Sequence, residues 1–178
     1  YNTILITAAF YLFFITLRDF FHRKYRNLSQ ITAHFSFSIL ILSILFNNIF
    51  SSEVITNLKI NETYQAQNLK INFESIEQEN KQNFKEIRGK FVVEDQSGLI
   101  EVMQPELRIY NQPNIVTSEA DIKTNIFTDK FMTMNYVQNQ DYFNIRYQVK
   151  PFMIWIWIST ILLCFSGCLS LIRKKYEN

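Results

Sequence analysis

Residues 142–172 read YFNIRYQVKPFMIWIWISTILLCFSGCLSLI, and their pattern changes once, at Lys150. Before that point polar and apolar side chains alternate, which predicts a β-strand. After it, no residue from Pro151 to Ile172 is charged, and the run is close to the roughly 20 residues that a helix needs to cross a bilayer. A strand that leads almost directly into a membrane helix predicts a β-rich domain held at a membrane surface. The alternation sets Tyr142, Asn144, Arg146 and Gln148 on one face of the strand and Phe143, Ile145, Tyr147 and Val149 on the other.

Two further runs, residues 1–17 and 28–52, also lack charged residues. The block between them and the last run is charged, rich in Asn and Gln, and patterned by two. We therefore expect an α+β membrane protein with three transmembrane helices and a β-rich domain between the second and the third. The expected order is a transmembrane helix at 1–17, a basic loop at 18–27, a transmembrane helix at 28–52, the β-rich domain at 53–150, a transmembrane helix at 151–172 and a basic tail at 173–178.

Basic residues predict how these segments are oriented, because Lys and Arg near a span favour the cytoplasmic or matrix side. The loop at 18–27 and the tail at 173–178 are both basic, and two spans separate them. The β-rich domain then lies on the opposite, trans side, and its excess of acids gives no sign of nucleic-acid binding. Tyr1 is not an initiator methionine, so we expect that sequence upstream is missing. The basic residues on which this orientation rests are Arg18, Arg23, Lys24, Arg26, Arg173, Lys174 and Lys175.

The β-rich block predicts an antiparallel barrel or sandwich. Its apolar runs are separated by Gly, Asn, Asp, Gln and Pro, and Asp95–Gly98 predicts a hairpin between two of them. Residues 53–150 contain no histidine and no cysteine, which excludes zinc sites of the usual kind and Cys–His nucleophiles within them. The block by itself therefore indicates a binding or scaffolding module.

His34 is the unusual residue of the second apolar run. On a helix, Gln30 lies one turn before it and Ser38 one turn after it, so the three form a polar stripe that should face protein. Two interpretations stay open on the residues alone. The imidazole either makes a hydrogen bond between helices or supplies one axial ligand of a haem iron, whose second ligand must come from elsewhere. His22, in the basic loop, is most simply a solvated surface residue.

The third apolar run holds the chain's two cysteines and two tryptophans. Cys164 and Cys168, with the small residues between and after them, predict a stripe on which another helix packs, since residues four apart on a helix are poorly placed for a disulfide. Trp155 and Trp157 are typical of an aromatic belt at the trans interface.

Five stretches resemble one known family: AHFSFSILILS (33–43), PELRIYNQP (105–113), TSEADI (117–122), TNIFTDKFM (124–132) and YQVKPFMIWIW (147–157). In this order they are similar to the C-terminal part of the cytochrome c maturation proteins of the CcmF/CycK family. These are the membrane haem lyase components of a multi-protein pathway found in bacteria and in some mitochondria. The last stretch, an aromatic strand that runs into a Trp-rich span, is the most specific.

The resemblance implies a role for His34 as one axial ligand of a resident haem b. It also implies the partners: an N-terminal CcmF portion on the same or a separate chain, other cytochrome c maturation proteins, apocytochrome c and the membrane. The family's tryptophan-rich haem-binding loop, its flanking trans-side histidines and a second membrane histidine are absent from this sequence. The resemblance therefore implies part of a haem lyase complex that is not catalytic alone, with the trans-side domain serving haem or apocytochrome handling and haem transport.

Other functions remain open on the sequence. The chain could be a non-catalytic structural subunit of a larger, for example respiratory, membrane assembly derived from such a fragment. A small membrane-anchored sensor is a third possibility. The abundance of Ile, Asn, Phe and Lys, with little Gly and Pro, is typical of an AT-rich genome. Many mitochondrial genomes are AT-rich, so this composition, together with the resemblance, implies the mitochondrial inner membrane, or alternatively a bacterial inner membrane.

Overall fold

The structure is a computed structural model that describes residues 2–22, 28–66, 69–95, 98–137 and 140–177. The chain forms two compact units. The helical unit comprises residues 1–51, 125–129 and 150–178, and the sandwich unit comprises residues 52–124 and 130–149. The short segment 125–129, expected within the β-rich domain, belongs to the helical unit because its backbone is hydrogen-bonded to the start of the last helix.

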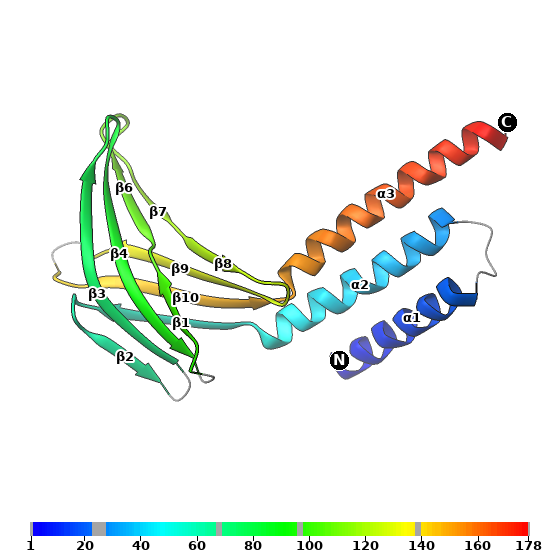
Figure 1. Cartoon of the computed structure of the whole chain (residues 1–178), viewed down its shortest axis with the longest axis horizontal. Helices are drawn as coiled ribbons and strands as arrows, with labels where there is room; N and C mark the ends of the chain where they lie inside the picture. Colours follow the sequence, from blue (N-terminus) through cyan, green and yellow to red (C-terminus); the bar gives the residue numbers. More distant parts are fainter. Residues whose placement is uncertain (1, 23–27, 67–68, 96–97, 138–139, 178) are drawn as a thin grey trace. The chain divides into compact units, whose positions relative to one another are not determined.

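The strands form two sheets in the described part of the chain, so that of the two expected architectures the sandwich is the one observed (Figure 1). One sheet has the order β1-β10-β9-β8 and the other β2-β3-β4-β6-β7, with β5 also paired to β4. The pairs β1/β10, β3/β4 and β4/β6 are antiparallel. The strands are β1 (Ser52–Leu58), β2 (Thr63–Ala66), β3 (Leu69–Asn80), β4 (Phe84–Asp95), β5 (Ile100–Met103), β6 (Glu106–Tyr110), β7 (Val116–Glu119), β8 (Asp121–Thr124), β9 (Thr128–Tyr136) and β10 (Phe143–Pro151).

Side chains from both sheets fill one core. Phe73 of β3 and Phe91 of β4 are fully buried and stack with their ring centroids 4.3 Å apart. From the other sheet, β9 contributes Met132 and Met134 and β10 contributes Ile145 and Tyr147, all of them buried. The predicted alternation of the last strand is confirmed for its buried face. The core consists of Leu58, Ile71, Phe73, Phe91, Val93, Met103, Leu107, Met132, Met134, Ile145 and Tyr147.

The predicted hairpin between Asp95 and Gly98 is also confirmed. The strands β4 and β5 pair from Phe91↔Met103 to Glu94↔Ile100. The Gly98 amide donates to the Asp95 carbonyl oxygen at 3.0 Å, and Gly98 has φ +75°, a conformation that glycine adopts without a Cβ penalty. Residues 96 and 97 of this turn lie outside the described residues.

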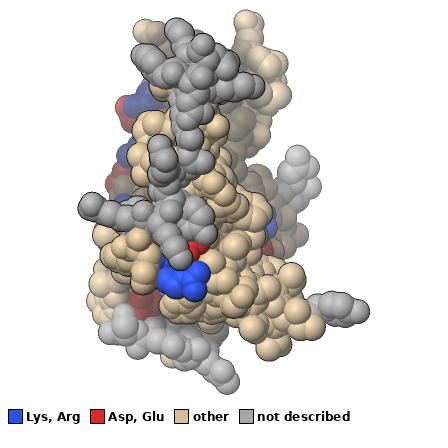
Figure 2. Space-filling model, turned by 90° about the vertical axis from the view of Figure 1, so that its right-hand side faces the viewer, with Lys and Arg blue, Asp and Glu red and all other residues tan. Residues whose placement is uncertain are grey.

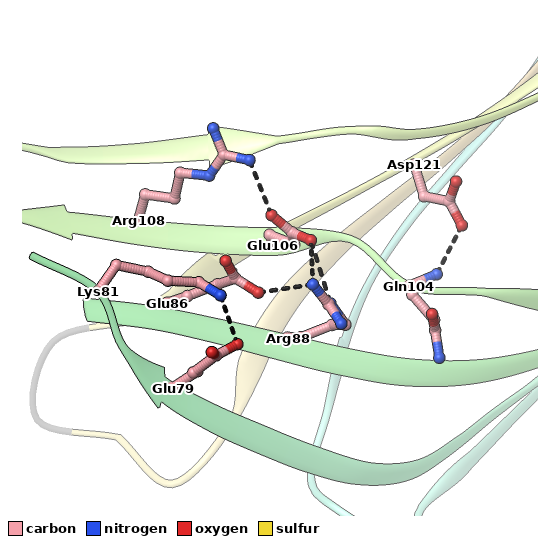
Figure 3. A network of polar contacts seen from close by, with 8 residues as sticks. All are labelled: Glu79, Lys81, Glu86, Arg88, Gln104, Glu106, Arg108 and Asp121. Carbon is pink, nitrogen blue, oxygen red and sulfur yellow. Dashed lines mark hydrogen bonds and ion pairs between the residues drawn. The ribbon is translucent and has the colours of Figure 1, made fainter. Parts of the chain in front are cut away.

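A network of ion pairs covers β4 and β6 (Figure 3). Arg88 donates to Glu106 Oε1 through Nε at 3.0 Å and Nη2 at 2.8 Å, and to Glu86 Oε1 at 2.6 Å. Arg108 Nη2 donates to the other oxygen of Glu106 at 3.0 Å. Burial alone raises the pKa of Glu106, but the hydrogen bonds from Arg108 and Arg88 outweigh it and hold this pKa below its ordinary value.

The helical unit contains α1 (Asn2–His22), α2 (Leu28–Phe50) and α3 (Met153–Glu177), and α2 packs against both of the others (Figure 1). Among the described residues, Leu28–Phe50 and Met153–Ile172 are long and apolar enough to cross a membrane. A membrane span at 1–17 stays a prediction. The helix α1 continues past that run through Arg18 to His22, and Arg23, Lys24 and Arg26 of the basic loop lie outside the described residues. Most of the described surface in Figure 2 is uncharged.

Serines lie where α2 packs against α3. Ser36 and Ser43 on α2 are buried, as are Ser159 and Ser166 on α3, and in each pair the two residues are seven positions apart. Ser29 Oγ, seven positions before Ser36, donates to the Ser166 carbonyl oxygen at 2.7 Å. Small side chains at this spacing let two helix backbones approach closely.

The small-residue stripe expected around the cysteines is therefore only partly used within this chain. Ser166 contacts α2, whereas Cys164 and Cys168 are exposed. A Cβ added to Gly167 meets nothing within 4 Å. Ser159 and Ser166, one heptad apart, supply the packing surface instead.

Replacing Gly89 by alanine should destabilise the sandwich. A Cβ at this position would lie 2.6 Å from Phe91 Cε2 and 2.8 Å from Met134 Sδ, and the Phe91 ring is held by its stack on Phe73. We expect a loss of about 1–3 kcal/mol, typical of overpacked cores. Hydrogen exchange of β4 amides in the full chain in detergent measures it. Gly167→Ala, which adds its methyl group to open space, is the matched control and should leave β4 exchange unchanged.

Replacing Glu106 by glutamine should weaken the sandwich and flatten its acid-side pH dependence. A carboxyl group whose pKa is lowered by folding stabilises the fold above its ordinary pKa of 4.5, and this contribution is lost as the pH falls through the lowered value. After discounting for solvent screening we expect a loss of about 1 kcal/mol at neutral pH. Hydrogen exchange of β4 and β6 between pH 7 and pH 3 measures it. Glu94→Gln, which removes a more exposed ion pair at 3.9 Å, should have a smaller effect; an equal effect would contradict the role given to the network.

Candidate functional site

A cavity of about 290 Å³ lies between α1 and α2. From α2, Gln30, Ile31 and His34 line it. From α1, Thr16 and Asp19 line it together with two apolar residues, Leu12 and Ile15. The cavity thus has apolar walls and a few polar groups, the usual composition of a site for a small molecule or cofactor.

His34 is the only imidazole among the described residues that line this cavity, and its side chain is exposed. Within the described part of the chain, no hydrogen bond or ion pair to either of its ring nitrogens is present. A neutral imidazole nitrogen is a common ligand of iron in haem proteins. His34 therefore offers an unused donor atom to a group placed in the cavity.

His22 is arranged differently. It lies in the last turn of α1, and its Nδ1 is 3.0 Å from the carbonyl oxygen of Arg18, so this nitrogen donates to the backbone. It is exposed and does not line the cavity. The prediction that His22 is a surface residue agrees with this position.

The predicted polar stripe is divided by the structure. Gln30 and His34 both line the cavity. Ser38 is fully buried, donates to the Phe35 carbonyl oxygen at 2.7 Å and lies 3.4 Å from Thr16 Oγ1. Ser38 thus serves helix packing, and Gln30 remains the member of the stripe that shares the cavity with the imidazole.

Sequence reasoning missed what α1 contributes to this site. Leu12, Thr16 and Asp19 recur at intervals of three or four residues and therefore lie on one helical face. Asp19 also lies 3.3 Å from the neighbouring Arg18. The signal that could have found this face is Thr16, a polar residue in an apolar run, one turn before the acid.

The side chains of the cavity would suit a bound group that this chain contacts from one side only. No cluster of three or more His, Cys, Asp or Glu that could bind a metal ion by itself is found among the residues that the structure describes. One imidazole beside apolar residues would suit a cofactor that needs a single ligand from this chain, such as a haem.

Comparisons with known proteins agree with this architecture. A family model described as the CcmF C-terminal beta-sandwich matches residues 49–151. A cytochrome c-type biogenesis protein ccl1 of Rhodobacter capsulatus is 29% identical over 120 residues, which cover 67% of this chain and 18% of that protein. The cytochrome c-type biogenesis protein CcmF of Haemophilus influenzae is 26% identical over 169 residues, which cover 91% of this chain and 26% of that protein.

A solved structure titled cytochrome c heme lyase CcmF has the same fold. It matches with a TM-score of 0.61 at 15% identity, covering 80% of this chain and 24% of that one. The chain spans about a fifth to a quarter of the relatives it matches, from 18% to 26% of their length. Because the family model covers more than half of the chain and lies on the observed sandwich, the chain belongs to the CcmF family of cytochrome c-type biogenesis proteins, of which it contains the C-terminal β-sandwich.

Proposed function

We propose that this chain is the C-terminal segment of a membrane haem lyase component of cytochrome c maturation, and that His34 supplies one axial ligand to a resident haem b. The observation that carries the proposal is the exposed imidazole with unused ring nitrogens in the cavity between α1 and α2. The interhelical hydrogen bond, which was the other interpretation of His34, finds no support among the described residues. Membership of the CcmF family supports the assignment.

The residues around the cavity divide the work of holding such a cofactor. His34 would bind the iron through one ring nitrogen, and Gln30, one helical turn away in the same cavity, would orient the ring through the other. Leu12, Ile15 and Ile31 would exclude water from the bound group. When bound, haem b supplies an iron centre that accepts and returns one electron. The chain would not be catalytic alone.

The remaining ligand is assigned to an N-terminal CcmF portion, on the same polypeptide or on a partner chain. The assignment is supported by the length of the relatives, of which the chain spans about a quarter, and by the single described histidine that lines the cavity. With the basic segments on the cytoplasmic or matrix side, the sandwich unit would face the intermembrane space or periplasm. There it would help to position apocytochrome c or the haem that is to be attached. The mitochondrial inner membrane is the proposed location and a bacterial inner membrane the alternative.

Replacing His34 by alanine tests the ligand role. In the purified complex we expect haem b content to fall by at least about tenfold, because losing even a residue that only supports a metal ligand costs roughly 10–100-fold in affinity. The measurement is a reduced-minus-oxidised absorption spectrum normalised to protein. Gln30→Ala should weaken haem binding less and keep the b-type spectrum.

His22→Ala is the matched control, since it removes the other imidazole of the chain without touching the cavity. It should leave the spectrum unchanged. An unchanged b-type signal in the His34→Ala complex would overturn the ligand assignment and favour the structural-subunit function.

A further inference from the structure

The turn between β8 and β9 carries two large apolar side chains that are exposed. Asn125 Oδ1 accepts hydrogen bonds from the backbone amides of Phe127 at 2.9 Å and Thr128 at 2.7 Å, and the Asn125 amide donates to the Thr128 carbonyl oxygen at 3.0 Å. This geometry fixes the turn locally. Ile126 and Phe127 nevertheless remain 62% and 61% exposed. Their exposure is therefore built into an ordered turn.

The same turn is bound to the beginning of α3. Trp155 Nε1 donates to the Ile126 carbonyl oxygen at 2.9 Å, and the Phe152 amide donates to the Phe127 carbonyl oxygen at 2.7 Å. The rings of Phe127 and Phe152 meet edge to face, with centroids 6.4 Å apart. All of these residues belong to the helical unit, and Figure 1 shows the turn beside the start of α3. The turn therefore lies level with the first turn of that helix.

The start of α3 is also where its apolar span begins, at Met153. Trp155 and the 63% exposed Trp157 follow within that first stretch, and tryptophans are enriched where a span meets the headgroup region. The segment between Lys123 and Asp129 carries no charge. Two exposed apolar side chains at this level are placed where a bilayer interface would cover them, as apolar residues of peripheral anchors are.

We propose that the Asn125–Thr128 turn is an interfacial membrane anchor, in which Ile126 and Phe127 insert among the lipid headgroups and upper acyl chains on the side where α3 begins. The inference rests on the proposed membrane crossing of α3 but not on the haem. The lipid bilayer is the occupant that fits, because the turn is tied to the start of an apolar span and its exposed side chains are purely apolar. The Trp155 indole N–H donates to the Ile126 carbonyl oxygen, and this hydrogen bond holds the turn at the same level along α3 as Trp155.

Depth-dependent fluorescence quenching tests this in the full chain, reconstituted into phosphatidylcholine vesicles. Cys164 and Cys168, the chain's two cysteines, are first replaced by serine. A bimane label on Phe127→Cys should be quenched several-fold more strongly by lipids with a nitroxide near the headgroup than by aqueous iodide. Ile126→Cys provides a second label on the same turn, should the first variant fail to fold.

Two matched positions calibrate the result. Ile100→Cys labels a residue of the sandwich unit that is 63% exposed, beside the ion pair of Glu101 with Lys130, and should report iodide quenching. Ile161→Cys labels an exposed residue within the α3 span and should report quenching by nitroxides deep in the acyl chains.

Three results would overturn the anchor. Stronger quenching by iodide than by lipid at 126 and 127 would place the turn in water. Protection from both quenchers would place it against protein, such as the N-terminal portion of a complete CcmF. Loss of lipid quenching at Ile161 as well would remove the membrane crossing on which the anchor rests. The haem spectrum of the His34→Ala complex is a separate readout, so failure of the anchor and failure of the proposed function are distinguishable.

Discussion

The helical unit depends on one backbone conformation, that of Phe152, where strand β10 becomes helix α3. Its φ of 60° is rare for a bulky residue and must be held by its surroundings. The Phe152 amide donates to the Phe127 carbonyl oxygen, and Asn47 Nδ2 donates to the Pro151 carbonyl oxygen at 2.6 Å. The Phe152 ring also packs on Phe46, with centroids 5.3 Å apart. The end of α2, the β8–β9 turn and the start of α3 thus meet at a sharp turn whose backbone groups are hydrogen-bonded within the protein.

Helix α2 packs differently against its two neighbours, α3 and α1. His34 and Ser36 are two positions apart, which turns their side chains by about 200° around the helix axis. Ser36 is buried where α2 packs closely on α3, and its small side chain lets the two helix backbones approach each other. His34 faces α1, where a cavity is left open. The close packing of α2 on α3 fixes the position of α2. On the side that faces α1, the cavity beside His34 can therefore stay open. A ligand site of fixed geometry needs both.

The sequence predicted those features that depend on local pattern. The alternation in β10 and the Asp95–Gly98 turn lie within short windows, and the structure confirms both. The short strands β7 and β8 were not predicted because VTSE and DIKT are too brief and too polar to show a period. Each forms by pairing with its neighbour in the chain, β7 with β6 and β8 with β9. The contribution of α1 to the cavity was missed for a similar reason. Which face of α1 meets α2 is decided by packing, for example of Phe13 on Phe35, and Thr16 is the residue of α1 that marks this face locally. Pairing and packing between elements decided what the pattern within one element could not.

The distribution of chemically active side chains separates the two units. Residues 53–150 contain neither histidine nor cysteine, and the buried carboxylate Glu86 of β4 and the half-buried Glu106 of β6 are both paired with Arg88. Both histidines and both cysteines of the chain lie in the helical unit. In the proposed complex the sandwich would then govern which protein is handled and the helical unit would hold the cofactor, so that variants of the two units should fail in different ways: the first in cytochrome assembly with haem retained, the second in haem content itself.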